Sequence, residues 1–212
     1  MTRFRRPAML SSEQAENIIG AENPAVTLHL AQTAARSLIG LTDEEFTEEA
    51  AQNLVQTIKE HGIDVVADLW ENQPPYTLPG AFWRIFLFHQ WYQRDKETVE
   101  NRFAEGIFTL QASGHAGAVE KLNLGALGKE IDALFNGEIR ISQTEWGRLT
   151  PLLERVAVAM WVLATGATYG NTWIESDADE LATEVTRRAK ALSTTAEELK
   201  LAADRDASGN LF

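Results

Sequence analysis

The stretch from residue 79 to residue 94 is apolar on every side of the helix that it predicts. Successive residues of a helix point about 100° apart, so the large apolar residues between 82 and 92 point to all sides of the helix axis. A helix of this kind is stable in water only where the rest of the chain encloses it. We therefore expect a fold organised around a buried, aromatic-rich central helix. The large apolar residues of this run are Phe82, Trp83, Ile85, Phe86, Leu87, Phe88, Trp91 and Tyr92.

Regions on both sides of this stretch also predict helices, because their apolar residues recur at three- and four-residue spacing between capping and breaking residues. We expect one helix from Pro24 to Gly40, and another that a capping box at residues 42–45 begins and Gly62 ends. After the central helix, Asp95 either begins a second helix or marks a bend in a single long one. The sequence therefore predicts an all-α, multi-helix bundle.

The second half of the chain continues the helical pattern. A hydrophobic helix is expected from residue 145 to about residue 165, ended by Gly166 and Gly170 and lying against the central helix. Capping residues at 176–179 predict a further helix, and Thr194 or Thr195 predicts a separate short one after it. The alternating segment 138–141 has no second alternating run to pair with, so we interpret it as an extended linker.

Length and composition limit the possible functions. The 212 residues suit a single helical domain, 1–212, with a flexible basic tail at residues 1–10 and a flexible tail at residues 204–212. The net charge of -12 repels phosphate backbones, so nucleic-acid binding is disfavoured. The chain has no cysteine, and its longest apolar run, 156–164, is much shorter than the ~20 residues of a membrane span. We expect a cytoplasmic protein without a membrane partner.

Two polar residues, Arg84 and His89, stand within the apolar central helix. Buried polar groups need partners, so each side chain must reach solvent, a carboxylate or a ligand. One interpretation is an internal salt bridge from Arg84 to an acidic residue of a neighbouring helix. The other is that Arg84 and His89, together with Trp83 and Trp91, line an aromatic pocket that binds an anion or another small molecule. The sequence leaves both open.

The last residues of the chain match the start of a calcium-binding EF-hand loop. Asp204, Asp206 and Ser208 place oxygen atoms at the first, third and fifth loop positions, and Gly209 follows them. The chain ends before the glutamate that closes such a loop. A weak calcium site is the only cofactor site that the sequence suggests, and a short polar tail is the alternative.

Motifs of enzymes are missing from the sequence. None of the four histidines has the helical spacing of metal ligands, and there is neither a phosphate-binding loop nor a GxSxG turn. We therefore expect a non-catalytic helical interaction protein, either a homo-oligomer or a partner-binding module. The alternative is a small-molecule-binding or enzymatic domain with an aromatic pocket near Trp83 and His89. A helical transcription regulator is the third hypothesis, which the acidic charge disfavours.

Overall fold

The regular secondary structure in the described part of the chain is all helical, which confirms the predicted fold class. A computed structural model describes residues 24–42, 46–114, 117, 119, 122–142, 145, 147–169 and 180–212, and within them it contains eight helices and no strand. The predicted basic tail at 1–10 and the capping residues 176–179 lie outside these residues. The helices are α2 (Pro24–Leu38), α3 (Glu48–His61), α4 (Asp64–Ala67), α5 (Leu78–Arg94), α6 (Lys96–Ala112), α7 (Leu124–Phe135), α8 (Thr150–Tyr169) and α9 (Glu180–Ala207).

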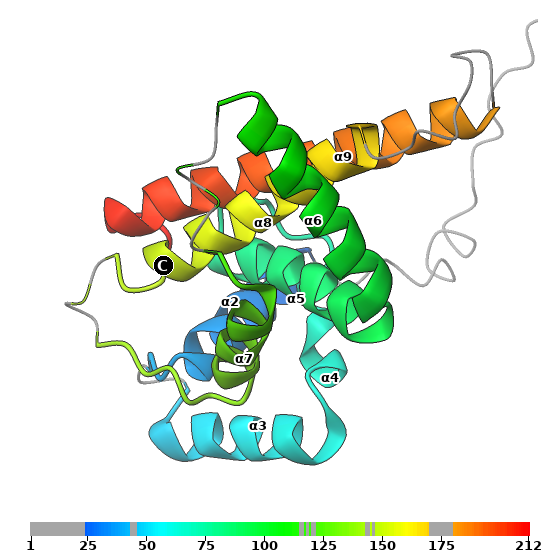
Figure 1. Ribbon diagram of the computed structural model, residues 1–212. Helices are drawn as coiled ribbons and strands as arrows, with labels where there is room; N and C mark the ends of the chain where they lie inside the picture. Colours follow the sequence, from blue (N-terminus) through cyan, green and yellow to red (C-terminus); the bar gives the residue numbers. More distant parts are fainter. Residues whose placement is uncertain are drawn as a thin grey trace, which may run out of the picture.

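The central helix of the fold is α5, as predicted, and other helices enclose it. Helices α2, α6, α7, α8 and α9 all contact α5, and Figure 1 shows α8 and α9 passing it on one side, with α2 and α7 below. Its aromatic residues Phe82, Phe86 and Phe88 are buried. Leu87 and Gln90 are exposed, so a narrow strip of α5 still reaches the surface.

Both ends of α5 follow from local sequence. The Thr77 hydroxyl accepts a hydrogen bond from the backbone N–H of Gly80 (3.3 Å), and Pro79 stands in the first turn, where its missing N–H costs nothing. At the other end Asp95 has φ -137° and ψ 53°, which interrupts the helical backbone. Of the two alternatives for Asp95, the structure therefore has a break between two helices.

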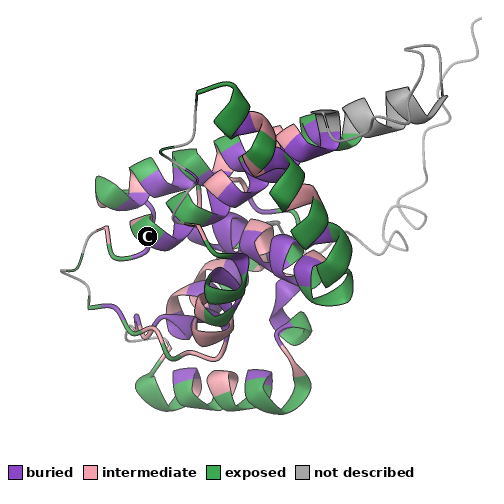
Figure 2. Ribbon diagram, viewed as in Figure 1, coloured by how far each residue is buried: buried purple, intermediate pink, exposed green. Residues whose placement is uncertain are grey.

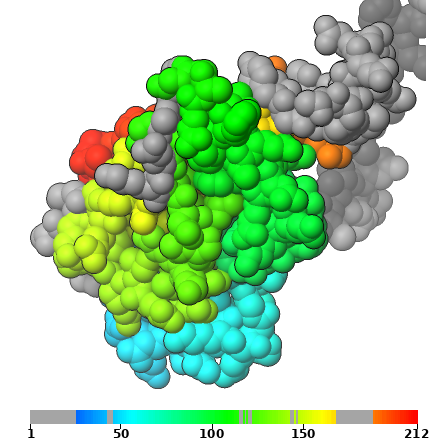
Figure 3. Space-filling view, in the orientation of Figure 1, coloured from blue at the N-terminus to red at the C-terminus, as the bar shows by residue number. Residues whose placement is uncertain are grey.

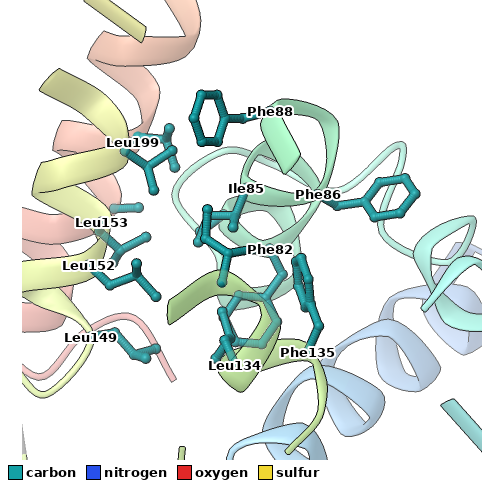
Figure 4. Close-up of a cluster of buried hydrophobic side chains, with 14 of the residues drawn as sticks. Phe82, Ile85, Phe86, Phe88, Leu134, Phe135, Leu149, Leu152, Leu153 and Leu199 are labelled. Atoms are coloured by element: carbon teal, nitrogen blue, oxygen red, sulfur yellow. The ribbon is translucent and has the colours of Figure 1, made fainter. Parts of the chain in front are cut away.

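The core lies where α5 meets α7, α8 and α9 (Figure 4). Ile85 of α5 faces Leu153 of α8, and Phe88 faces Leu199 of α9, while Phe82 lies beside α7; all of these side chains are almost completely buried. Phe135 of α7 lies edge-on to the Phe82 ring, with 6.4 Å between the ring centroids. Each fully buried side chain of this size contributes about 1.5–3 kcal/mol to folding. Apolar packing is thus the main support of the fold.

Two glycines allow α6 and α8 to cross closely. A Cβ at Gly166 would lie 2.1 Å from the carbonyl oxygen of Arg102, and a Cβ at Gly106 would lie 2.1 Å from that of Val162. Such distances are too short for any side chain, so both positions require glycine. Of the two glycines predicted to end this helix, Gly166 lies inside α8, which continues to Tyr169 and uses Gly166 as its contact with α6, and Gly170 lies outside the described residues.

Helices α8 and α9 form an antiparallel pair. Thr150 at the start of α8 donates a hydrogen bond to Asp206 near the end of α9 (2.7 Å), while Glu154 pairs with Lys200 (3.1 Å). The predicted separate helix after Thr194 or Thr195 was wrong. The Thr195 hydroxyl bonds to the carbonyl of Ala191 inside one continuous helix, so it does not act as a cap.

The lower part of the molecule is α3 with its neighbours α2 and α4. Thr47 caps α3, since its hydroxyl accepts from the backbone N–H of Ala50, whereas we predicted a capping box at 42–45; residues 43–45 lie outside the described part. Figure 2 shows α3 exposed along its outer face and buried only toward α2 and α7. In Figure 3, α3 and α4 form the lower edge of the visible face, below α6 and α7.

The connection between α7 and α8 is extended, as we predicted for residues 138–141. These residues belong to no helix, and the backbone N–H of Ile141 donates to the carbonyl of Ile39 (2.9 Å). This single bond ties the linker to the end of α2. The Ile141 side chain is buried in the core, so alternation here places apolar groups inward without a sheet.

Candidate ligand-binding site

Arg84, the first of the predicted site residues, makes an internal ion pair. Its Nε lies 2.5 Å from Oε2 of Glu198 on α9, and its Nη1 donates to the carbonyl of Gly80 (2.8 Å). Both charged side chains are largely shielded from water, with 14% and 28% of their surface exposed. The geometry therefore matches the salt bridge to a neighbouring helix, the first of the two interpretations that the sequence left open.

His89, the second polar residue of α5, is also held by protein groups. Its Nε2 lies 2.8 Å from Oδ1 of Asp132 on α7 and 3.3 Å from Nε2 of Gln93. The ring stands edge-on to Phe135 at a centroid distance of 6.0 Å. Its Nδ1 is buried without a hydrogen-bond partner among the described residues. His89 thus links α5 to α7 within the core.

The two predicted tryptophans lie in different surroundings. Trp83 stacks on Phe86 with the ring centroids 5.4 Å apart, beside the core. Trp91, two turns further along α5, faces a surface groove and carries the guanidinium of Arg102 5.6 Å from its ring centroid. Arg84 and His89 point to different neighbouring helices, α9 and α7, so the four predicted residues do not converge on one pocket, and Trp91 is the one that lines the groove described next.

The groove beside Trp91 is formed where the end of α5 and the start of α6 meet α8 and α9. Its volume is about 530 Å³, within the usual range of small-molecule sites. We call it the arginine groove. It is lined by Leu87, Phe88, Trp91, Arg94, Asp95, Thr98, Arg102, Met160, Arg188, Ala191, Leu192 and Thr195.

Positive charge dominates the arginine groove. Arg94, Arg102 and Arg188 line it against one carboxylate, Asp95, although the whole chain has a net charge of -12. Burial lowers the pKa of Arg102, and the nearby charge of Arg188 lowers it further, against the opposing effects of Glu105 and Asp95. Neither Arg94 nor Arg102 has an ion pair with another described residue. An anion here would relieve the repulsion between the guanidinium groups of Arg102 and Arg188.

The remaining lining offers an apolar wall and two hydroxyls. Leu192 and Met160 face the groove together with the Trp91 ring. Thr98 adds a hydroxyl group, and so does Thr195, whose proton is donated to the carbonyl of Ala191 and whose oxygen can accept. Trp91 has a flat face on which Arg102 already lies, an arrangement that suits stacking of a planar group. Chemically, the groove can bind a molecule with an anionic end and an aromatic or apolar body.

The predicted calcium ligands at the C-terminus point to separate partners. Asp206 is completely buried and accepts from Thr150, whereas Asp204 pairs with Lys200 on the surface (2.7 Å). The Ser208 hydroxyl donates to the carbonyl of Arg205 (3.0 Å). Because α9 continues through Ala207, these residues do not form the open loop of an EF-hand. Residues 204–212, predicted to be a flexible tail, instead include the buried Leu211.

Asp206 has a structural role instead. Its Oδ2 accepts the Thr150 hydroxyl, its backbone carbonyl accepts from the N–H of Gly147 (3.1 Å), and it lies at the start of α8. Burial raises the pKa of Asp206, against the lowering effect of hydrogen bonds from Thr150 and from the backbone of Leu149. Its Oδ1 is buried without a hydrogen-bond partner among the described residues, and the negative charge lies at the N-terminal end of α8, where the helix dipole favours it.

Metal-binding clusters and membrane-spanning segments were also sought. Within the described ranges, no three His, Asp or Glu side chains are placed to hold a metal ion together. Among the helices described, none combines the length and apolar character that crossing a bilayer requires. Comparison of the chain with protein-family models, curated proteins and solved structures gives no match.

Sequence reasoning identified Trp91 but missed the arginines around it. Residues 94, 98 and 102 are spaced four apart, so Arg94, Thr98 and Arg102 would share a face if the helix were continuous. This spacing could have predicted that the two arginines lie together. It does so only if the helix is continuous, and the sequence left a break at Asp95 open. Arg188 is far away in the sequence, and nothing in the sequence pairs it with Trp91.

Proposed function

We propose that this protein is a non-catalytic binding protein for small organic anions, and that the arginine groove is its binding site. The observation that carries the proposal is the convergence of Arg94, Arg102 and Arg188 beside Trp91 on a strongly acidic chain. Like charges are kept together at a cost, and a bound anion offsets that cost. Guanidinium groups also hold carboxylates and phosphates through paired hydrogen bonds.

The favoured ligand is an aromatic carboxylate or an aryl phosphate. The anionic end would lie between the guanidinium groups, and the ring would lie against Trp91 and the apolar wall that Leu192 and Met160 form. Inorganic phosphate would fill only the charged end, and an uncharged ring only the apolar end. Tight binding therefore requires both parts of the ligand.

Thermal-shift measurements with matched compounds test this proposal. We expect 2-naphthyl phosphate and 2-naphthoate to raise the melting temperature in a concentration-dependent way, because a ligand that binds only the folded state stabilises it. Inorganic phosphate and 2-naphthol at the same concentration should have much smaller effects. Equal stabilisation by 2-naphthol, or no stabilisation by either anion, would contradict an anion site.

Substitution of one groove arginine locates the site. Arg102→Met keeps most of the apolar stem but removes the guanidinium, so binding of 2-naphthyl phosphate should weaken at least tenfold by calorimetry, since a hydrogen bond to a charged group contributes about 1.5–3 kcal/mol. Arg155→Met is the matched control, because Arg155 pairs with Glu130 at a distance of 2.5 Å and does not line the groove. Equal weakening by both variants would mean that only net charge matters.

The protein-interaction hypothesis has a separate support. Several large apolar side chains of the described surface are exposed, among them Phe108 on α6 and Trp161 on α8, with 74% and 37% of their surface accessible. Neither lines the arginine groove. Light scattering at micromolar concentration tests this hypothesis. If the protein is a homo-oligomer, the measured mass should be at least twice that of the monomer. A monomeric mass would exclude the homo-oligomer and leave binding to a different protein as the remaining form of the hypothesis.

A further inference from the structure

A second groove runs along the antiparallel pair of α8 and α9, on a face that the arginine groove does not include. Its volume is about 740 Å³, and we call it the α8–α9 groove. Its residues recur at helical spacing on both helices, so they form one continuous stripe on each. The lining consists of Glu154, Ala157, Val158 and Trp161 from α8, and Ser193, Ala196, Glu197, Lys200, Leu201 and Asp204 from α9.

The shape of the α8–α9 groove fits a third helix. Small side chains, Ala157 and Ala196, are buried along its floor, while Trp161 and Leu201 stand exposed on its walls. The stripe on α9 from residue 193 to residue 204 is about 16 Å long at the 1.5 Å rise of a helix. That length matches about three turns of a partner helix whose apolar side chains enter between the walls.

The charges of the α8–α9 groove favour a positively charged partner. Glu154, Glu197 and Asp204 line it against one cation, Lys200, which is held by hydrogen bonds to Asp204 and Glu154. Glu197 has no ion pair with another described residue. A symmetric contact with the same face of a second copy would bring these carboxylates toward each other. The surface therefore disfavours self-association and complements positive charge.

We infer that the α8–α9 groove is a docking site for a basic amphipathic helix of another protein. The apolar stripe of that helix packs between Trp161 and Leu201, and its flanking lysines or arginines face Glu197 and the other carboxylates. This site is independent of the arginine groove, since the two share no lining residue. Failure of anion binding would leave it untouched.

Fluorescence anisotropy with designed peptides tests the inference. The probe is a labelled 18-residue peptide of leucine and lysine with leucine at helical spacing. One control peptide has the same composition in scrambled order, and another replaces lysine with glutamate. Because the chain is acidic throughout, the scrambled peptide measures non-specific attraction. We expect the amphipathic basic peptide to bind at least tenfold more tightly than either control.

Two variants with exposed apolar residues place the binding on this face. Leu201→Asp in the groove should weaken binding of the basic peptide at least tenfold, whereas Val65→Asp on α4, outside the groove, should leave it unchanged. Leu201 and Val65 are similarly exposed, 45% and 48%, so neither change is expected to unfold the protein, which circular dichroism verifies.

Three results would overturn the inference. They are equal binding of the scrambled peptide, unchanged binding by Leu201→Asp, and a dimer of the peptide-free protein that Leu201→Asp dissociates. The last result would assign the groove to a second copy of the chain. Glu197→Lys adds a further test, because it replaces a negative charge at the edge of the groove with a positive one. This variant should bind the lysine peptide more weakly and the glutamate peptide more tightly than wild type does.

Discussion

The two grooves beside α9 differ in the sign of their charge. Residues 188, 191, 192 and 195 of α9 line the arginine groove, whereas residues 193, 196, 197, 200, 201 and 204 line the α8–α9 groove, where carboxylates outnumber the single lysine. One helix thus contributes to a groove lined mainly by arginines and to a groove lined mainly by carboxylates. Under the two proposals, ligands of opposite charge would bind to the same protein without competing.

A parallel difference separates the two arginines of the α5–α6 region. Arg84 is paired with Glu198, whereas Arg102 lies on Trp91 beside Arg188. The first arginine is satisfied by the protein, and the second has its charge opposed by its surroundings. Perturbed charged groups in clefts are where ligand sites are commonly found. The comparison predicts that Arg84 contributes to stability and Arg102 to binding.

Among the substitutions considered, Gly166→Ala should cause the largest change in stability and should also affect the arginine groove. Its Cβ would overlap the carbonyl of Arg102, so α6 must move away from α8, at a cost of about 3 kcal/mol in unfolding free energy. Urea denaturation measures this loss, and binding of 2-naphthyl phosphate should weaken with it because α6 carries Arg102. Gly117→Ala is the control, since a Cβ at Gly117 would have no heavy atom within 4 Å.

Removal of the Asp206 side chain should have the next largest effect. Asp206→Ala removes the nearer acceptor of the Thr150 hydroxyl, at 2.7 Å, and leaves only the carbonyl of Ala203 at 3.4 Å, which costs about 1–3 kcal/mol of stability. The change lies at the Asp204 end of the α8–α9 groove, so peptide binding should weaken more than anion binding. If Asp206→Ala loses no more stability than the surface variant Asp64→Ala, the structural role of Asp206 is contradicted.

The same carboxyl predicts a particular pH dependence. Because burial raises the pKa of Asp206, the folded state holds this proton more tightly than the unfolded state. Its contribution is therefore fully present below the pKa of an unfolded aspartate and is lost as the pH rises through the folded pKa. Asp206→Asn keeps the amide oxygen for Thr150 without the charge, so its stability relative to wild type should increase over that rise in pH, as urea denaturation at each pH would measure.

A smaller effect should separate the two arginines directly. Arg84→Met breaks the pair with Glu198 and should reduce stability by about 1 kcal/mol, because both groups are still partly hydrated, while leaving affinity for 2-naphthyl phosphate within a factor of two. Arg102→Met should show the opposite pattern, with weak binding and unchanged or improved stability. Urea denaturation measures the stability of both variants, and calorimetry on the same samples measures their affinity for 2-naphthyl phosphate. Equal changes in the two variants would contradict the assignment of Arg84 to stability and Arg102 to binding.

The fold was largely predictable from the sequence because helical patterning and burial act locally. The all-round apolar run of α5 follows from neighbouring residues, whereas for Asp95 the sequence left a break and a bend open and the structure has the break. The function of Gly166 did not follow, because a glycine that ends a helix and one that permits a close crossing look alike in sequence. Thr195 similarly resembled a cap while lying within a continuous helix.

The site was less predictable because it depends on contacts between distant segments. Sequence placed Arg84 and His89 in the centre of the protein, but their partners, Glu198 and Asp132, are 114 and 43 residues away. The same limit applies to Arg188, which reaches Trp91 only through the packing of α9. Residue types predicted that partners were needed, and only the tertiary arrangement decides whether a partner is a protein group or a ligand.

The central claim, that anions bind beside Trp91, is tested most directly by NMR of the tryptophan indole N–H groups. The chain has six tryptophans, and Trp91→Phe and Trp161→Phe assign the two relevant signals. On titration with 2-naphthyl phosphate, the account predicts that the Trp91 signal shifts and saturates while the Trp161 signal stays in place, and that Arg102→Met abolishes the shift. A shift of Trp161 without Trp91, or no saturable shift of Trp91, would contradict it.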